Sequence, residues 1–319
     1  MAILLLVEYV FHQDWALHRV RSVFAAGRAM DKVLYVENAR PVMLILGNSR
    51  ADNGFDPGIV ARVMGRTSPG SVFNMGLPGA DARVLMGILL RLDRAGALGG
   101  EGIKQVVISL DEALLQKVDT LGQEVFFADR PTLWRDGEYH DWLRANLRLY
   151  GYSENLRQLR EPGSLSRFVQ ALRQDTDPVG GSARLHAGYR AGIGGLQDNA
   201  AALRQEAGSR NPPDAGNLTH FWRMVALLRE RGVEVAVTFP PLLTRNVLYM
   251  TAESPEAAPY QAVLRELRRW DVPIIVLDRE VPRRPAEFVN AGHLNDLGAQ
   301  RYSALLGDAL AAIWPVAKK

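Results

Sequence analysis

Short apolar runs alternate along the chain with longer stretches that have helical periodicity. Five runs predict strands buried on both faces: 42–46 (VMLIL), 71–76 (SVFNMG), 105–110 (QVVISL), 233–239 (VEVAVTF) and 273–278 (PIIVLD). Helices are predicted over 79–96, 217–232, 258–271 and 295–314, with Asn217 and Gly232 as end signals of the second. This alternation predicts a three-layer α/β/α fold around a five-stranded parallel, flavodoxin-like sheet.

The interval from about 112 to 216 interrupts the alternation. It is rich in arginine, glycine and aromatic residues, and segment 178–196 has no clear period. We interpret it as a largely helical insertion or cap after the third strand, within a single domain over residues 1–319. Segments 132–142 and 186–190 combine aromatic, Arg and His residues, which suits either a carbohydrate-binding surface or solvent-facing helices with inward-packed aromatics.

Residues 1–40 form a predicted helical lead-in. The apolar run before Glu8 is too short to span a bilayer. It also lacks the basic flank of a signal peptide. Two interpretations stay open: a first core element, or the remainder of a membrane anchor.

The composition excludes several classes of function. The chain is 47% hydrophobic and 23% charged, as in ordinary globular proteins. Without cysteine it has no disulfide, no catalytic thiol and no cysteine-ligated metal. The basic residues are scattered, which argues against nucleic-acid binding. We found neither metal-ligand spacing nor a phosphate-binding loop, so no metal or cofactor is predicted.

Candidate chemistry begins at the end of the first predicted strand. The stretch LILGNSR brings Ser49 to the carboxyl end of that strand, where doubly wound sheets bind ligands. Ser49 either lies in an ordinary strand-to-loop turn or is presented for chemistry. The second strand ends in N-x-G-x-x-G, with Asn74, Gly76 and Gly79. This is either a tight turn or a source of backbone N–H groups for an oxyanion hole.

His293, one of six histidines, is predicted to lie in a loop just before the last helix. Together the G-N-S, N-x-G-x-x-G and H-L-N blocks resemble the SGNH hydrolases, also called GDSL esterases. The stretches LGNSR and FNMGLPGADAR are especially similar to bacterial proteins of polysaccharide O-acetylation, such as those that acetylate alginate and cellulose.

The resemblance implies a role for each matching residue. Ser49 would be the nucleophile and His293 its general base. The N–H groups of Ser49 and Gly76 would form the oxyanion hole. Asn74 would brace the glycine turn, and Asn48, at the family's usual aspartate position, would tie the serine turn to neighbouring backbone.

Other positions depart from the family pattern or stand beside it. Asp111 occupies the place of an oxyanion-hole asparagine, so it is protonated, turned away, or engaged elsewhere, for example with an Arg. Asn290 occupies the place of the acidic partner of the histidine. Glu287, Asp296 or a main-chain carbonyl are the candidate substitutes for that acid. Arg50, next to Ser49, is a candidate substrate-binding residue because guanidinium groups recognise carboxylates and sugar hydroxyls.

The resemblance therefore implies serine-dependent acyl transfer to a saccharide, or hydrolysis from one, within exopolysaccharide O-acetylation. Its partners would be a saccharide or polysaccharide acceptor, an acyl donor and a membrane-bound acyltransferase. The location would be periplasmic or otherwise outside the cytoplasm. The alternative is a catalytically weak accessory protein that binds polysaccharide or a biosynthetic complex, since Asn290 and Asp111 are what loss of catalysis looks like.

Overall fold

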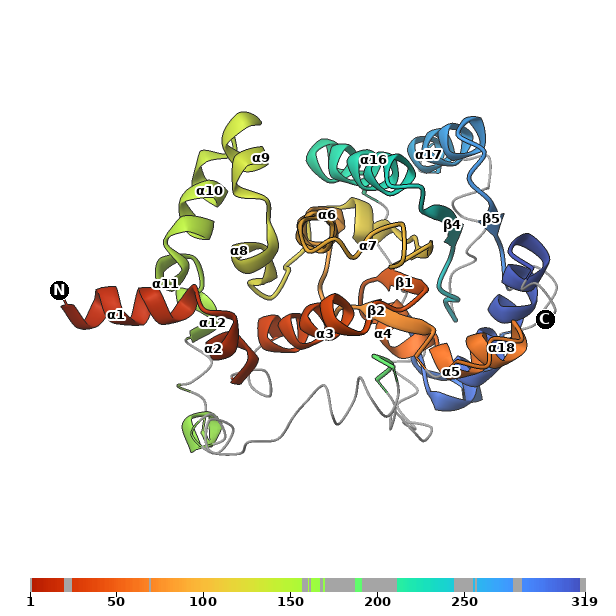
Figure 1. Ribbon diagram of the computed structural model, residues 1–319, viewed down its shortest axis with the longest axis horizontal. Coiled ribbons are helices and arrows are strands. Elements are labelled where there is room, and N and C mark those ends of the chain that lie inside the picture. Colours follow the sequence, from red (N-terminus) through yellow and green to blue (C-terminus); the bar gives the residue numbers. More distant parts are fainter. Residues whose placement is uncertain are drawn as a thin grey trace.

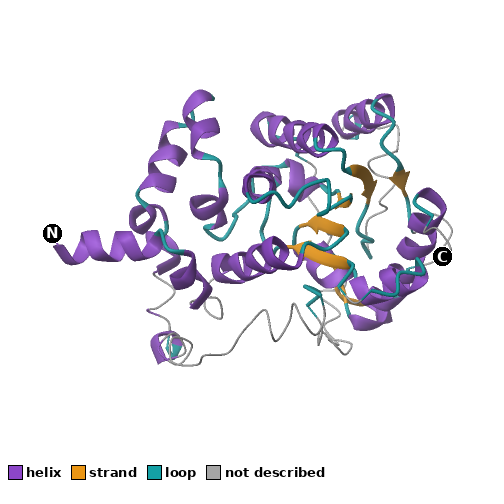
Figure 2. Ribbon diagram, in the orientation of Figure 1, coloured by secondary structure: helices purple, strands orange, loops and turns teal. Residues whose placement is uncertain are grey.

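The protein is described from a computed structural model (Figures 1 and 2). The structure describes residues 2–19, 25–68, 70–156, 160, 162–166, 169, 187–190, 211–243, 255, 257–277 and 283–315. Most of the aperiodic segment 178–196, and the end of the proline-rich loop after residue 243, lie outside these residues.

The predicted five-stranded parallel sheet is confirmed. Its strands are β1 (Met43–Gly47), β2 (Val72–Gly76), β3 (Gln105–Ser109), β4 (Glu234–Thr238) and β5 (Ile274–Ile275). Their order is β2-β1-β3-β4-β5, with every pair parallel. This is the flavodoxin-like order, in which the chain reverses direction across the sheet between β1 and β3.

The last strand is shorter than predicted. The sequence predicts a strand over 273–278, but only two residues pair, with Val237 and Thr238 of β4. The side chain of Leu277 still packs into the core, although its backbone has left the sheet. A continuous apolar run predicts burial, and here burial continues beyond the last residue that is hydrogen-bonded within the sheet.

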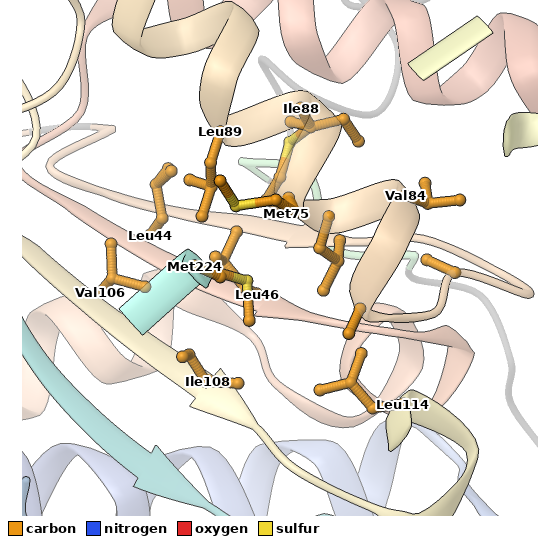
Figure 3. Packing of buried hydrophobic residues seen from close by; sticks show 14 of the residues in the cluster. Leu44, Leu46, Met75, Val84, Ile88, Leu89, Val106, Ile108, Leu114 and Met224 are labelled. Carbon is orange, nitrogen blue, oxygen red and sulfur yellow. The ribbon is translucent and has the colours of Figure 1, made fainter. Parts of the chain in front are cut away.

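Helices cover both faces of the sheet. On one face lie α3 (Ala25–Ala39), α6 (Ala82–Arg94), α16 (Ala215–Glu230) and α17 (Ala258–Arg269). Figure 3 shows Leu44, Val106 and Met75 from the strands meeting Ile88 of α6 and Met224 of α16. The other face is covered by α4 (Ser49–Gly54), α5 (Pro57–Val63) and α18 (Asp296–Ile313). Alternate strand residues face opposite layers, so both layers are held by apolar burial.

The N-cap of helix α16 lies three residues before the predicted cap. The Asp214 side chain accepts a hydrogen bond from the Asn217 N–H at 2.9 Å and is the N-cap, so the prediction of Asn217 is wrong. Asn217 lies in the first turn, and its Nδ2 donates to the Gln116 carbonyl at 2.8 Å. Both residues are good caps, and tertiary contacts decide between them.

The remaining elements belong to the N-terminal segment, the insertion and the C-terminal part. The first two helices are α1 (Ala2–Phe11) and α2 (Asp14–Arg19). The described part of the insertion holds α7 (Glu112–Leu115), α8 (Gln123–Phe127), α9 (Arg130–Arg135), α10 (Tyr139–Asn146), α11 (Arg148–Gly151) and α12 (Ser153–Leu156). A 3-10 turn, η4 (Pro285–Glu287), precedes strands β6 (Phe288–Asn290) and β7 (His293–Leu294). In Figure 1, α8 to α11 and α1 stand at one end of the molecule, away from α18.

Candidate active site

Ser49 is the first residue of a helix that starts where β1 ends. Asn48 caps this helix, α4, because its Oδ1 accepts a hydrogen bond from the Arg50 N–H at 3.0 Å. Ser49 thereby lies at the carboxyl end of β1, beside the β1–β3 switch point. The sequence left open an ordinary strand-to-loop turn or a serine presented for chemistry, and no helix was predicted here, although Asn48 is a cap signal for one.

His293 reaches Ser49 from a two-stranded antiparallel hairpin, not from the loop that was predicted. Strands β6 and β7 pair Asn290 with His293 and are joined by Ala291 and Gly292. The hairpin brings His293 Nε2 to 2.8 Å from Ser49 Oγ. The sequence signal for such a hairpin, Asn-Ala-Gly between apolar residues, is short and easily mistaken for a loop.

Asn290 sets the orientation of the imidazole. Its Oδ1 accepts a hydrogen bond from the Gly292 N–H at 2.9 Å and lies 3.0 Å from His293 Nδ1. Because Oδ1 is fixed as an acceptor by the backbone, Nδ1 carries the proton and Nε2 presents its lone pair to Ser49. The amide therefore selects the tautomer that a general base needs, although it supplies no negative charge.

The imidazole is a weak base. Burial, followed by the positive charge of Arg50, lowers the pKa of His293 to about 4, against the opposing effect of Asp111. At neutral pH the ring is uncharged and ready to accept a proton. A carboxylate on Nδ1 would stabilise the protonated form, and an amide stabilises it much less.

Asp111 is engaged with Arg50 and Asn48. Its Oδ2 accepts from Arg50 Nη1 at 2.8 Å, and both of its carboxylate oxygens lie 2.9 Å from Asn48 Nδ2. It also caps α7 by accepting the Leu114 N–H at 2.9 Å. The same Arg50 Nη1 also lies 3.5 Å from Glu112 Oε2. Asp111 thus orients an arginine, and the candidate substrate-binding residue Arg50 has its Nη1 committed to two buried carboxylates.

The Gly76 N–H, which the resemblance assigns to an oxyanion hole, is engaged by a neighbouring side chain in this structure. This N–H donates to Asn74 Oδ1 at 2.8 Å. Asn74 Nδ2 donates in turn to the carbonyls of Ala51 and Phe55, so the amide ties β2 to α4. A Cβ at position 76 would lie 2.3 Å from the Asp52 nitrogen, so glycine is needed for the close approach of the two backbones. By contrast, the Ser49 N–H has no acceptor among the described residues.

Lys32 of α3, a buried residue that was not predicted from the sequence, supports the junction between β2 and α4. Lys32 Nζ donates to Asp52 Oδ1 at 2.8 Å and to the Gly76 carbonyl at 2.6 Å. The Asn74 carbonyl lies 3.1 Å from the same nitrogen, and Arg28 Nη2 lies 2.8 Å from Asp52 Oδ1. Burial lowers the pKa of Lys32 to about 8, against the attraction of Asp52, so the ammonium stays largely charged at neutral pH. Its pairing partners come from distant parts of the chain and carry no local signal.

Four residues of the insertion, 187–190, also lie against the site. The Asn74 N–H donates to the Ala187 carbonyl at 2.8 Å, and the Arg190 N–H donates to the Asp52 carbonyl at 3.1 Å. Gly188 has a φ of +84°, and a Cβ there would lie 2.2 Å from the Asn74 carbonyl oxygen. The charge of Arg190 contributes to lowering the pKa of His293. The insertion therefore affects the electrostatics of the Ser49 site.

The two acids considered as substitutes for Asn290 have other partners. Glu287 accepts both of its short contacts, 2.7 and 2.6 Å, from Arg301 Nη1. Asp296 Oδ1 accepts from the Tyr189 hydroxyl at 2.6 Å. The hydrogen-bond partner of His293 Nδ1 is therefore Asn290, and neither Glu287 nor Asp296 takes its place beside the ring.

No known protein family and no curated protein matches the chain.

Across the described residues, no group of His, Cys, Asp and Glu has the arrangement of a metal site. Among the helices in those residues, none is both long and apolar enough to cross a membrane.

Proposed function

We propose that this chain is a serine-dependent acyltransferase or esterase of the SGNH-hydrolase type that acts on a saccharide. The observation that supports the proposal best is the 2.8 Å contact of Ser49 Oγ with His293 Nε2, with Asn290 Oδ1 on the opposite ring nitrogen. This is the geometry of a nucleophile, its base and the group that orients the base. The position at the switch point of a doubly wound sheet supports it further.

The proposed reaction has two halves. Ser49 Oγ attacks the carbonyl carbon of an acyl ester while His293 Nε2 takes the hydroxyl proton. The ester's C–O bond then breaks, and the departing alcohol leaves with that proton. In the second half, a sugar hydroxyl or water gives its proton to Nε2 and attacks the acyl carbon. The bond between that carbon and Ser49 Oγ then breaks, and the proton returns to Ser49 Oγ. The Ser49 N–H, which has no acceptor among the described residues, is the candidate donor to the developing oxyanion.

Because the partner of His293 Nδ1 is the uncharged Asn290, we expect the enzyme to be slow. In serine proteases, exchanging the equivalent aspartate for asparagine lowers turnover by about 10⁴, partly through the wrong tautomer. Here the Gly292 N–H holds Asn290 Oδ1 as an acceptor, so the tautomer part of that loss does not arise. What remains is the missing charge.

The decisive experiment is to trap the acyl-enzyme. The native chain is incubated with p-nitrophenyl acetate, quenched in acid and weighed by intact-mass spectrometry, with peptide mapping to locate the adduct. We expect one acetyl group on Ser49, and none in Ser49→Ala. An equal amount of adduct in Ser49→Ala, or an acetyl group mapped only to lysines, contradicts the proposal.

The alternative is an accessory protein on the same fold. It is favoured by the uncharged partner of His293 and by the Gly76 N–H that is donated to Asn74. A chain that forms no adduct and releases no nitrophenol above the Ser49→Ala rate supports this alternative. Three further expectations rest on the family resemblance alone and stay predictions. They are the saccharide acceptor, the membrane-bound acyltransferase partner and the extracytoplasmic location.

A further inference from the structure

A polar cavity lies between the insertion and the start of α16. Its volume is about 390 Å³, within the range of about 300–1,000 Å³ that small-molecule sites occupy. Its lining residues are Arg83, Lys117, Gly137, Glu138, Tyr139, His140, Asp141, Asp214, Gly216, Asn217 and His220. None of them belongs to the Ser49 site.

Two of the lining side chains are buried and only partly satisfied. His220 is 4% exposed, and its Nδ1 has no hydrogen-bond partner among the described residues. Its Nε2 lies 4.0 Å from Glu138 Oε1, beyond direct hydrogen-bond distance. Arg83 is 9% exposed, and its Nε likewise has no partner in the described part of the chain. Both unpaired nitrogens are closed to solvent, so a ligand in the cavity would contact other polar atoms of the lining, such as His220 Nε2 and the Glu138 carboxylate.

The charges of the lining nearly balance. Arg83 Nη1 lies 2.6 Å from Asp141 Oδ2 and 3.7 Å from Glu138, so the guanidinium is neutralised internally. Asp214 is the cap of α16, and Lys117 adds one positive charge. Burial, followed by the positive charge of Arg223, lowers the pKa of His220 to about 4, so this ring is neutral at physiological pH. A polyanion is therefore disfavoured, and an apolar ligand would strand these polar groups.

An aromatic face completes the cavity on the side of α10. Tyr139 lines it and is 58% exposed, so its ring is available to a ligand. The ring is held in place by edge contact with Trp134, at 5.1 Å between centroids, and Trp134 in turn contacts Trp142 at 4.9 Å. A rigid ring beside planar carboxylate, guanidinium and imidazole groups presents an apolar face and several hydrogen-bonding directions together.

We propose that this cavity is a binding site for an uncharged saccharide ring, with Tyr139 against the sugar face and Glu138, Arg83 and His220 on its hydroxyls. A sugar offers a weakly polar C–H face and hydroxyls that both donate and accept, which matches this lining. Helix α7 connects the two sites, because Asp111 caps it on the Ser49 side and Lys117 follows it on the cavity side. The proposal does not depend on Ser49 being catalytic.

The test is titration calorimetry of the native chain with a panel of uncharged oligosaccharides: cellohexaose, maltohexaose, xylohexaose and mannohexaose. We expect at least one to bind saturably. Glu138→Gln and Tyr139→Ala should each weaken that binding by about tenfold, since each removes an interaction of roughly 1–2 kcal/mol. Tyr150→Ala is the matched control, because Tyr150 is also an exposed tyrosine, 53%, and lies outside the cavity lining.

Several outcomes overturn the proposal. One is that none of the four sugars binds at a concentration of about 10 mM. A dissociation constant in the millimolar range corresponds to only about 4 kcal/mol of binding free energy. A second is that Tyr150→Ala weakens binding as much as Tyr139→Ala does. A third is that an oligogalacturonate of the same length binds more tightly than every neutral probe. Loss of binding in Ser49→Ala would place the sugar at the Ser49 site instead. Acetyl-adduct formation on Ser49 is measured separately, so failure of either proposal is recognised without the other.

Discussion

Two histidines in this molecule, the buried His220 and the partly buried His293, have pKa values lowered in the same direction but lie in different surroundings. His293 and His220 both have a pKa lowered to about 4, mainly by burial. Both ring nitrogens of His293 have partners, Ser49 Oγ and Asn290 Oδ1. The Nδ1 of His220 has none among the described residues, and a carboxylate stands 4.0 Å from its Nε2.

The difference shows that a perturbed pKa does not define a role. What separates the two rings is the direction in which their lone pairs and protons point. At His293 a fixed amide orients the ring toward a hydroxyl, which suits proton transfer. At His220 no such chain of orientation exists, because its Nδ1 is closed to solvent and has no hydrogen-bond partner among the described residues.

The comparison is tested most strongly by removing the base. We expect His293→Ala to lower kcat/KM for p-nitrophenyl acetate by about 10²–10⁴, the usual contribution of a general base. Tyr150→Ala, on an exposed ring that belongs to neither site, should stay within about twofold. A His293→Ala variant with native turnover would remove the catalytic half of the comparison.

The next largest effect is expected at Lys32. Lys32→Met leaves Asp52 buried with Arg28 as its remaining cationic partner among the described residues, and breaking a buried pair in this way typically costs about 3–5 kcal/mol. Urea denaturation followed by circular dichroism measures the loss. Lys104→Met, at an exposed lysine, is the matched control and should change the free energy of unfolding by less than about 0.5 kcal/mol. Equal values for the two variants would show that the Lys32 contacts contribute nothing.

Both histidines should also affect stability as a function of pH. Their pKa values are lowered in the folded state, from 6.5 to about 4, so the unfolded chain binds more protons between these limits. The stabilisation from keeping each ring neutral is therefore complete above pH 6.5 and is lost as the pH falls toward 4. Each ring accounts for roughly 3 kcal/mol. His220→Gln should flatten the decline of the unfolding free energy between pH 6.5 and 4. An unchanged slope would mean that His220 is protonated at no cost in the folded state.

The smallest expected effect is a gain. Asn290→Asp keeps an acceptor for the Gly292 N–H and His293 Nδ1 and adds the missing charge, which raises the pKa of His293. We expect kcat for p-nitrophenyl acetate to rise by about tenfold or more, about 1.4 kcal/mol of transition-state stabilisation. The acidic limb of the pH–rate profile should move to higher pH. A lower kcat with an unmoved limb would show that the charge is not what limits the reaction.

The sequence predicts well what depends on periodicity and strand order. Five apolar runs with helices between them define the sheet, and strand-end placement brings Ser49 and His293 to the same edge. It fails where side-chain direction decides. The family pattern assigns the Gly76 N–H to an oxyanion, but the neighbouring Asn74 side chain accepts it. The support from Lys32 is invisible because its partners are 20, 42 and 44 residues away.

Lys32 also has a consequence for how the molecule opens. Its ammonium connects α3 to the carbonyls at the end of β2 and to the carboxylate of α4. Transient detachment of α3 therefore leaves Asp52 without its lysine partner and loosens the helix that carries Ser49. In native-state hydrogen exchange, the amides of α3 and α4 should consequently behave as one cooperative unit, although strand β1 separates their residues in the sequence.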